Sequence, residues 1–111
     1  MIDYSTFEKL DLRVGTILSA KDFPDARKPA YQLEIDFGSI GILQSSAQIT
    51  NRYNLKELIG KQIIAVVNIG IRKIADFESH CLVLGATHNN EVILLTTESQ
   101  TKSYIKYNIS T

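Results

Sequence analysis

The chain has 111 residues, 44% of them hydrophobic, which suffices for one domain with a core and excludes two ordinary domains. Its formal net charge of zero argues against a strong, general attraction to nucleic acid, and its single cysteine excludes an internal disulfide. No stretch approaches the roughly 18 apolar residues of a membrane span, and the N-terminus is acidic where a signal peptide is basic, so we expect a cytoplasmic protein without membrane insertion.

The N-terminal third predicts a short helix and two strands. Ser5 and Glu8 have the spacing of a capping box and should open the helix. Apolar residues then alternate with other residues over 12–18, which predicts a first strand with a bend or bulge at Gly15. After a long proline-containing loop, strict alternation over 31–37 predicts a second strand with one buried and one hydrated face.

The rest of the chain predicts further strands around one helical segment. A third strand is expected over 40–45. Residues 47–59 should form short helical turns, with a capping signal at Asn54 and Glu57 and a stop at Gly60. The remaining predicted elements are strands at Lys61–Asn68, Cys81–Thr87 and Glu91–Thr96, and a weaker final strand or arm at Ser103–Ile109.

Short strands, a helix inserted after the third strand and the absence of a βαβ rhythm predict an all-β fold with little helix. The economical arrangement is a single OB-type, five-stranded Greek-key barrel, because closing the sheet removes its exposed edges. Its core should span about residues 10–96, with an N-terminal helix and a C-terminal extension outside it.

Three predicted strands are apolar at successive positions, over 63–67, 81–84 and 92–95. Successive side chains of a strand point to opposite faces, so both faces of these strands must be covered. The barrel interior covers one face, and either a second subunit or the N-terminal helix must cover the other. We therefore predict a homodimer.

Residues suited to catalysis are scarce. His80 and His88 are the only histidines, and neither has a second ligand at the spacing of a metal site. Cys81 directly follows His80, so in a strand the two side chains point to opposite faces and make a poor nucleophile–base pair. The sequence also has no glycine-rich phosphate loop. We expect a protein that is not an enzyme and uses no metal or cofactor.

The features suited to binding are a basic block and two polar segments. Residues 51–74 carry five basic residues against Glu57 alone, which indicates either an anion-facing patch or a solvated face. The basic residues of this block are Arg52, Lys56, Lys61, Arg72 and Lys73.

Ser45, Ser46 and Gln48 place hydrogen-bonding side chains at the end of the third strand, where they can approach a phosphate or sugar, although Ser46 can equally cap the next helical turn. Asn68, Arg72 and Lys73 fall in the loop after the fourth strand, one of the two loops that frame the usual OB ligand groove.

The predicted hydrated face of the second strand bears Gln32, Glu34 and Asp36. A general single-strand binder needs aromatic side chains in a basic groove, so these acids argue against single-stranded DNA as the ligand. If RNA is bound, its shape and backbone should matter more than base stacking.

Four segments in this order and spacing resemble a known family, the tRNA-binding OB domain that is also found at the C-terminus of some methionyl-tRNA synthetases. The chain length, the loop at Phe23–Arg27 and the block Gln44–Tyr53 look more like one branch of it, the secretion chaperone CsaA. The four segments are Phe7–Ile17, Ser45–Ile49, Ile64–Asn68 and Arg72–Ser79.

The resemblance implies an OB barrel whose terminal extensions form a tight homodimer, and tRNA recognition through the loops holding Ser45–Gln48 and Asn68–Ser79. For the chaperone branch it implies binding of preproteins or unfolded polypeptides and a role in protein export, with the export machinery as a further partner. The hypothesis is thus a non-catalytic export chaperone with a tRNA-binding OB domain, and the alternative is a stand-alone tRNA-binding module or synthetase accessory subunit.

Overall fold

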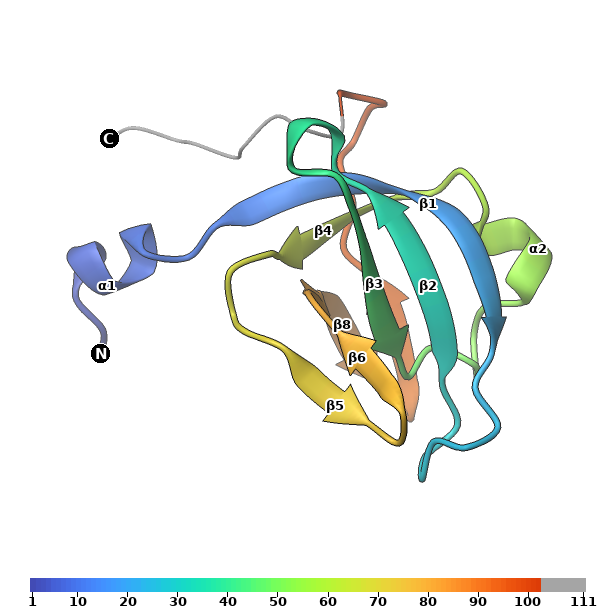
Figure 1. Ribbon diagram of the computed structural model, residues 1–111. Coiled ribbons are helices and arrows are strands. Elements are labelled where there is room, and N and C mark those ends of the chain that lie inside the picture. Colours follow the sequence, from blue (N-terminus) through green and yellow to red (C-terminus); the bar gives the residue numbers. More distant parts are fainter. Residues whose placement is uncertain (103–111) are drawn as a thin grey trace.

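The computed structural model describes residues 1–102, which form a nearly closed, five-stranded antiparallel barrel of the OB type (Figure 1). The predicted all-β fold is confirmed. The strand order in the barrel sheet is β3-β2-β1-β4-β7. These strands are β1 (Leu12–Asp22), β2 (Tyr31–Asp36), β3 (Ile42–Ala47), β4 (Gln62–Val66) and β7 (Leu82–Val83).

Two hairpins and three short helical segments complete the described chain. The predicted final strand at Ser103–Ile109 lies outside the described residues. Within residues 1–102, no helix has the length and apolarity needed to cross a membrane. The hairpins are β5 (Arg72–Ile74) with β6 (Phe77–Ser79) and β8 (Gly85–His88) with β9 (Glu91–Leu94), and the helical segments are α1 (Tyr4–Glu8), η1 (Gly38–Ile40) and α2 (Leu55–Leu58).

Strand β1 is the central strand of the barrel sheet. Its first half pairs with β4 and its second half pairs with β2. The register with β2 shifts between Ile17 and Ser19, and such an irregularity bends a strand and increases its twist. The bulge expected at Gly15 therefore lies a few residues further on. Gly15 has a different role: a Cβ atom placed there would lie 2.5 Å from Ile35 Cγ2 and 2.6 Å from a ring carbon of Phe37.

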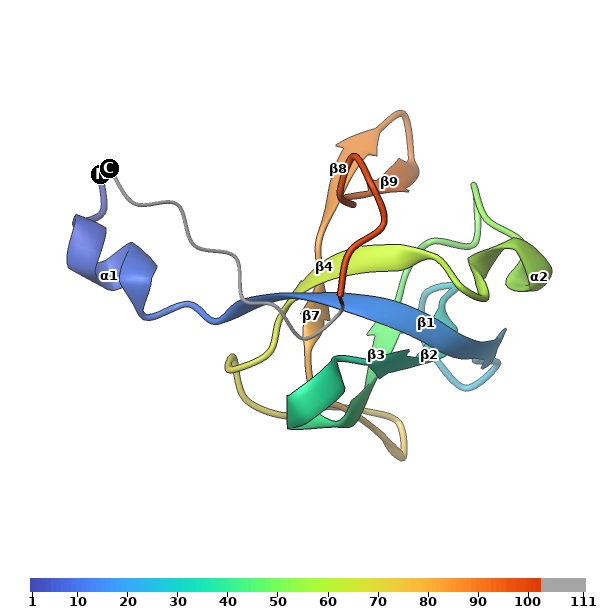
Figure 2. The same ribbon diagram turned by 90° about the horizontal axis from the view of Figure 1, so that it is seen from above.

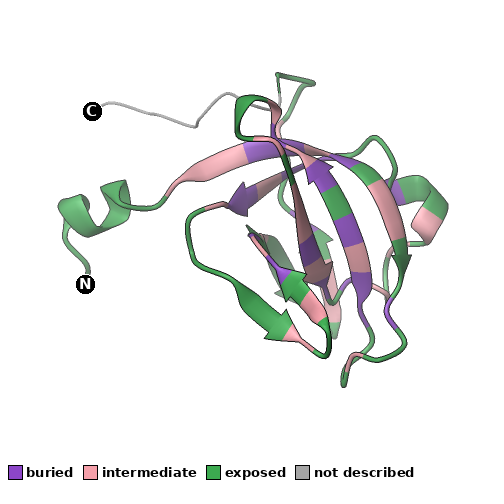
Figure 3. Cartoon of the chain, viewed as in Figure 1, coloured by how far each residue is buried: buried purple, intermediate pink, exposed green. Residues whose placement is uncertain are grey.

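The core fills the barrel from one side of each strand. Along β2, buried residues alternate with less buried ones, as the sequence pattern predicted (Figure 3). Leu33, Ile35 and Phe37 are at most 1% exposed. Helix α2 adds Leu58 to this core, and its predicted capping box forms, with Glu57 N–H donating to Asn54 Oδ1 at 2.9 Å.

Hydrogen bonds between β3 and the segment from β6 to β7 bring the two ends of the sheet together. The His80 N–H donates to Gln44 O at 2.8 Å, and Gln44 Nε2 donates to Glu78 O at 2.8 Å. At the next residue of β3, Ser45 Oγ donates to Cys81 O at 3.0 Å. These contacts place the β5–β6 hairpin beside the end of β3.

Several predicted boundaries were wrong, for local reasons. Helix α1 begins at Tyr4 and its N-cap residue Asp3 makes no side-chain capping bond, so the capping box at Ser5 does not form. Strand β3 begins at Ile42 because η1 and Gly41, with φ of 94°, turn the chain first. The predicted fifth strand is two strands, β7 and β8, because Leu84 N–H bonds across to Ile64 O at 2.9 Å and Leu95 N–H bonds to Leu84 O at 3.1 Å.

Helix α1 projects away from the barrel and buries none of its residues (Figure 2). Tyr4, Phe7 and Leu10 are 57%, 41% and 39% exposed, and the Tyr4 and Phe7 rings contact each other edge to face. The helix thus does not cover the barrel's own strands. The sequence left two candidates for covering the outer face of the apolar strands, a second subunit and the N-terminal helix. This geometry excludes α1 of the same chain.

Candidate functional site

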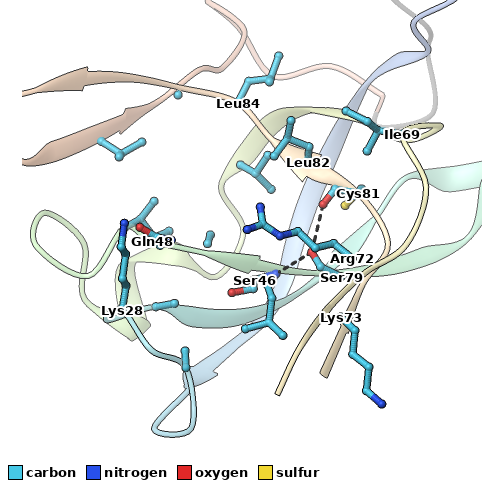
Figure 4. A pocket seen from close by; sticks show the side chains of 18 of the residues that line it. Lys28, Ser46, Gln48, Ile69, Arg72, Lys73, Ser79, Cys81, Leu82 and Leu84 are labelled. Carbon is cyan, nitrogen blue, oxygen red and sulfur yellow. Dashed lines mark hydrogen bonds between the residues drawn. The ribbon is translucent and has the colours of Figure 1, made fainter. Parts of the chain in front are cut away.

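An open groove of about 1260 Å³ runs between the β1–β2 loop, the end of β3, the β5–β6 hairpin and strand β7 (Figure 4). It combines charged, polar and aliphatic side chains from segments that are far apart in the sequence. The barrel closure described above brings these segments together, since it fixes β6 and β7 against β3.

Cationic side chains reach the groove from two directions. Arg27 and Lys28 come from the β1–β2 loop, and Arg72 and Lys73 come from β5, whereas Asp25 is the one carboxylate among the described lining residues. The Arg72 guanidinium reaches across toward Gln48, Lys28 rises on the far side, and Lys73 points away (Figure 4). The groove therefore carries a local positive charge in a chain that is neutral overall.

Aliphatic side chains form the other wall. Ile69, Ile71 and Leu82 are 53%, 65% and 45% exposed although all three line the groove. Figure 4 shows Ile69, Leu82 and Leu84 together on the side opposite Lys28 and Gln48. No Phe or Tyr is among the lining residues of the described chain, so the groove offers no ring on which a base could stack.

Two of the predicted site residues are buried in the floor beneath the groove. Ser45 and Ser79 are 1% and 7% exposed. The Ser46 N–H donates to Ser79 Oγ at 3.1 Å, and Ser79 Oγ lies 3.4 Å from Ser45 Oγ. Ser45 and Ser79 therefore hold β3 against β6, and of the two only Ser79 is among the residues that line the groove.

The remaining predicted residues divide into two groups. Ser46, Gln48, Arg72 and Lys73 line the groove, and Ser46 lies within β3, so it does not cap a helical turn. Arg72 and Lys73 belong to β5 rather than to a loop. Arg52 lies outside the lining, where its guanidinium is 3.5 Å from Glu91 and packs over the Tyr53 ring.

Asn68 is exposed, but its side chain already has two backbone partners. Asn68 Oδ1 accepts from the Asp11 N–H at 2.9 Å, and Asn68 Nδ2 donates to Lys9 O at 2.7 Å. The amide therefore ties the segment between α1 and β1 to the end of β4. These contacts give Asn68 a structural role, and a ligand contact by this residue stays a prediction.

Cys81 lies at the base of the groove and is 4% exposed. Burial raises the pKa of its thiol to about 11, so the group is a neutral thiol at physiological pH. The neighbouring His80 ring points to Glu78, at 3.4 Å, and not to the cysteine. Among residues 1–102, no three His, Cys, Asp or Glu side chains gather in a way that could hold a metal ion.

Comparison with known proteins shows the family to which the chain belongs. A family model described as "Putative tRNA binding domain" matches residues 12–104. The chain belongs to this family. Methionine–tRNA ligase of Methanococcoides burtonii is 33% identical over 102 residues, which cover 91% of this chain but 15% of that enzyme. This tRNA-binding domain thus spans a small part of the curated relatives it matches.

Solved structures of full-chain similarity are also known. Chaperone CsaA from Bacillus anthracis str. Ames has a TM-score of 0.93 and 47% identity, covering 97% of this chain and 99% of that chain. The CsaA chaperone protein from Picrophilus torridus has a TM-score of 0.91 and 50% identity, covering 97% and 100%. The resemblance to the CsaA branch is confirmed.

Sequence reasoning missed Arg27 and Lys28 of this tRNA-binding domain, although two loops were expected to frame an OB groove. Only the loop after the fourth strand was assigned to it. The signal was present, because the β1–β2 loop contains adjacent arginine and lysine next to a proline. Both residues line the same groove as Arg72, and Figure 4 shows Lys28 across from it; this arrangement depends on closure of the barrel, which residue spacing does not reveal.

Proposed function

We propose that this protein is a non-catalytic chaperone that binds extended apolar segments of unfolded polypeptides in the groove. A role in the export of preproteins, as the resemblance to the CsaA branch implies, is part of this proposal. The observation that carries it is the exposed aliphatic wall of Ile69, Ile71 and Leu82, which a bound apolar segment would remove from water.

A polypeptide suits this wall better than a single-stranded nucleic acid does. Bases bind in OB grooves largely by stacking on aromatic side chains, whereas the described lining offers aliphatic ones. The two chaperone structures with about half of their residues identical to this chain support the same assignment. The function is tested by light scattering from a denatured protein as it aggregates. We expect suppression at a near-stoichiometric ratio, and no suppression at several-fold excess would contradict the proposal.

Binding of tRNA is the second candidate. The cations that line the groove, which form no ion pair within residues 1–102, favour it together with the family membership. Replacing Lys28 and Arg72 with alanine should weaken tRNA binding and lower the slope of log affinity against log salt by about 1–2 units, because two phosphate contacts are lost. Fluorescence anisotropy at several salt concentrations measures this slope. The matched control is the pair Lys56→Ala and Lys61→Ala, which lies outside the groove. Equal slopes for both variants would place any tRNA site elsewhere.

A homodimer is the assembly that we propose for this protein. The exposed Tyr4 and Phe7 of α1, and Leu10 just after this helix, need a cover that their own barrel does not supply. The two hydrogen bonds of the Asn68 side chain to the α1–β1 segment fix the orientation of this helix relative to the barrel. The terminal extensions are the parts that the family resemblance assigns to dimerisation.

Replacing Asn68 with alanine should lower the free energy of unfolding by about 1–2 kcal/mol, because two hydrogen bonds are lost. It should also shift the sedimentation profile at micromolar concentration from dimer toward monomer, since α1 is no longer held. The Asn68→Asp variant keeps the acceptor and should be intermediate. A wild-type protein that sediments as a monomer, or an alanine variant indistinguishable from it in both measurements, would contradict this account.

A further inference from the structure

The cations of the groove have no acidic partner within the described chain. Two other arginines of the protein are paired, Arg13 with Asp11 at 2.7 Å and Arg52 with Glu91 at 3.5 Å. By contrast, no ion pair within residues 1–102 involves Arg27, Lys28, Arg72 or Lys73. Lys73 points away from the groove and Asp25 offsets one charge, so Arg27, Lys28 and Arg72 leave the groove with a positive charge that is available to a ligand (Figure 4).

The acidic side chains of the exposed sheet face point elsewhere. Glu34 accepts a hydrogen bond from Ser19 Oγ at 2.6 Å, and Asp36 accepts one from the Gly38 N–H at 2.8 Å. Both lie on the outer side of β2, outside the groove lining. The groove thus attracts an acidic ligand and this face repels it. The electrostatic potential therefore differs in sign between the two surfaces, although the net charge of the chain is zero.

The aliphatic wall and the cationic side chains face the same space. Arg72 extends between Leu82 on one side and Gln48 on the other, so a segment lying in the groove would contact both kinds of surface (Figure 4). An apolar stretch covers the wall, and the residues just before and after it meet the cations. Like charges at those flanking positions would oppose binding, whereas opposite charges would favour it.

We infer that the groove selects polypeptide segments in which apolar residues are flanked by aspartate or glutamate, and that it discriminates against segments flanked by lysine or arginine. This inference rests on the proposed polypeptide-binding function and names the class of segment that is bound. It predicts that the acidic, apolar parts of a client are held, and that its basic parts are left free.

The test uses three synthetic peptides with one apolar core of alternating Leu and Val and two flanking residues at each end, which are Glu, Gln or Lys. Their affinities for the full chain are measured by fluorescence anisotropy. We expect the Glu-flanked peptide to bind about tenfold more tightly than the Gln-flanked peptide, from a few exposed ion pairs, and the Lys-flanked peptide to bind more weakly than both. In 1 M salt the three affinities should converge, because the charges are screened.

A matched pair of variants locates the effect. Arg72→Glu reverses one charge within the groove and should reduce the preference for Glu flanks at least threefold, whereas Lys56→Glu reverses one charge on α2 and should leave it unchanged. Equal affinity for all three peptides overturns the inference but leaves the proposed function standing. Binding of tRNA with no binding of any peptide overturns both, and assigns the groove to nucleic acid.

Discussion

Replacing Gly15 with valine prevents folding, and replacing it with alanine lowers the free energy of unfolding by about 2–3 kcal/mol. Gly15 lies in the part of β1 that pairs with β4, and its missing Cβ would point into the core. The Ile35 and Phe37 side chains occupy the space that this Cβ would need. Both neighbours are 0% exposed, so neither can move aside without disturbing the rest of the core. Urea unfolding followed by circular dichroism measures the effect as a lower midpoint.

A double-mutant cycle separates overpacking from a general loss of stability. Ile35→Ala alone should cost about 2–5 kcal/mol, because it leaves a cavity. It also removes the Cγ2 atom that a Cβ at position 15 would meet at 2.5 Å, so the double variant should lose less than the sum of the two single variants. An alanine variant with the wild-type midpoint would show that the barrel can relax around this site.

Replacing both Ile69 and Ile71 with serine weakens the binding of an unfolded polypeptide about 30-fold. A ligand can cover only the surface that is exposed in the free protein, and these side chains are 53% and 65% exposed. Burying about half of an isoleucine side chain contributes about 1 kcal/mol, so losing two of them costs about 2 kcal/mol. The affinity for a labelled, permanently unfolded protein is the measurement, and aggregation of a denatured protein should be suppressed less in parallel.

The chain offers a closely matched control for this pair. Ile42 and Ile59 are 58% and 50% exposed, and neither lines the groove. Replacing both with serine removes the same kind of surface and should leave polypeptide binding within about twofold of the wild type. If the two double variants lose affinity equally, the protein binds polypeptides by diffuse apolar contact and not in the groove.

The elements that sequence predicted well are those set by local chemistry. Strand β2 follows strict alternation, and α2 begins with a capping box whose two partners are three residues apart. The β5–β6 hairpin was missed because each strand has three residues, and contacts with β3 position it rather than its own pattern.

The candidate site was predicted only in part, because local chemistry does not show which side chains the tertiary structure buries. Arg72 and Gln48 line the groove as exposed polar residues, and their basic and amide side chains already suggest exposure. Ser45 and Ser79 have the same chemistry in the sequence, but barrel closure buries them against each other. A serine on an alternating strand can face either side, and only the tertiary pairing decides which.

The most direct test of the central claim is to map the polypeptide site by nuclear magnetic resonance. An unlabelled apolar peptide is titrated into the ¹⁵N-labelled full chain, and the amide shifts are followed residue by residue. The groove account predicts the largest changes at Lys28, Gln48, Ile69–Lys73 and Leu82–Leu84. Changes confined to α1 or to the outer face of β2, with the groove amides unmoved, would contradict it.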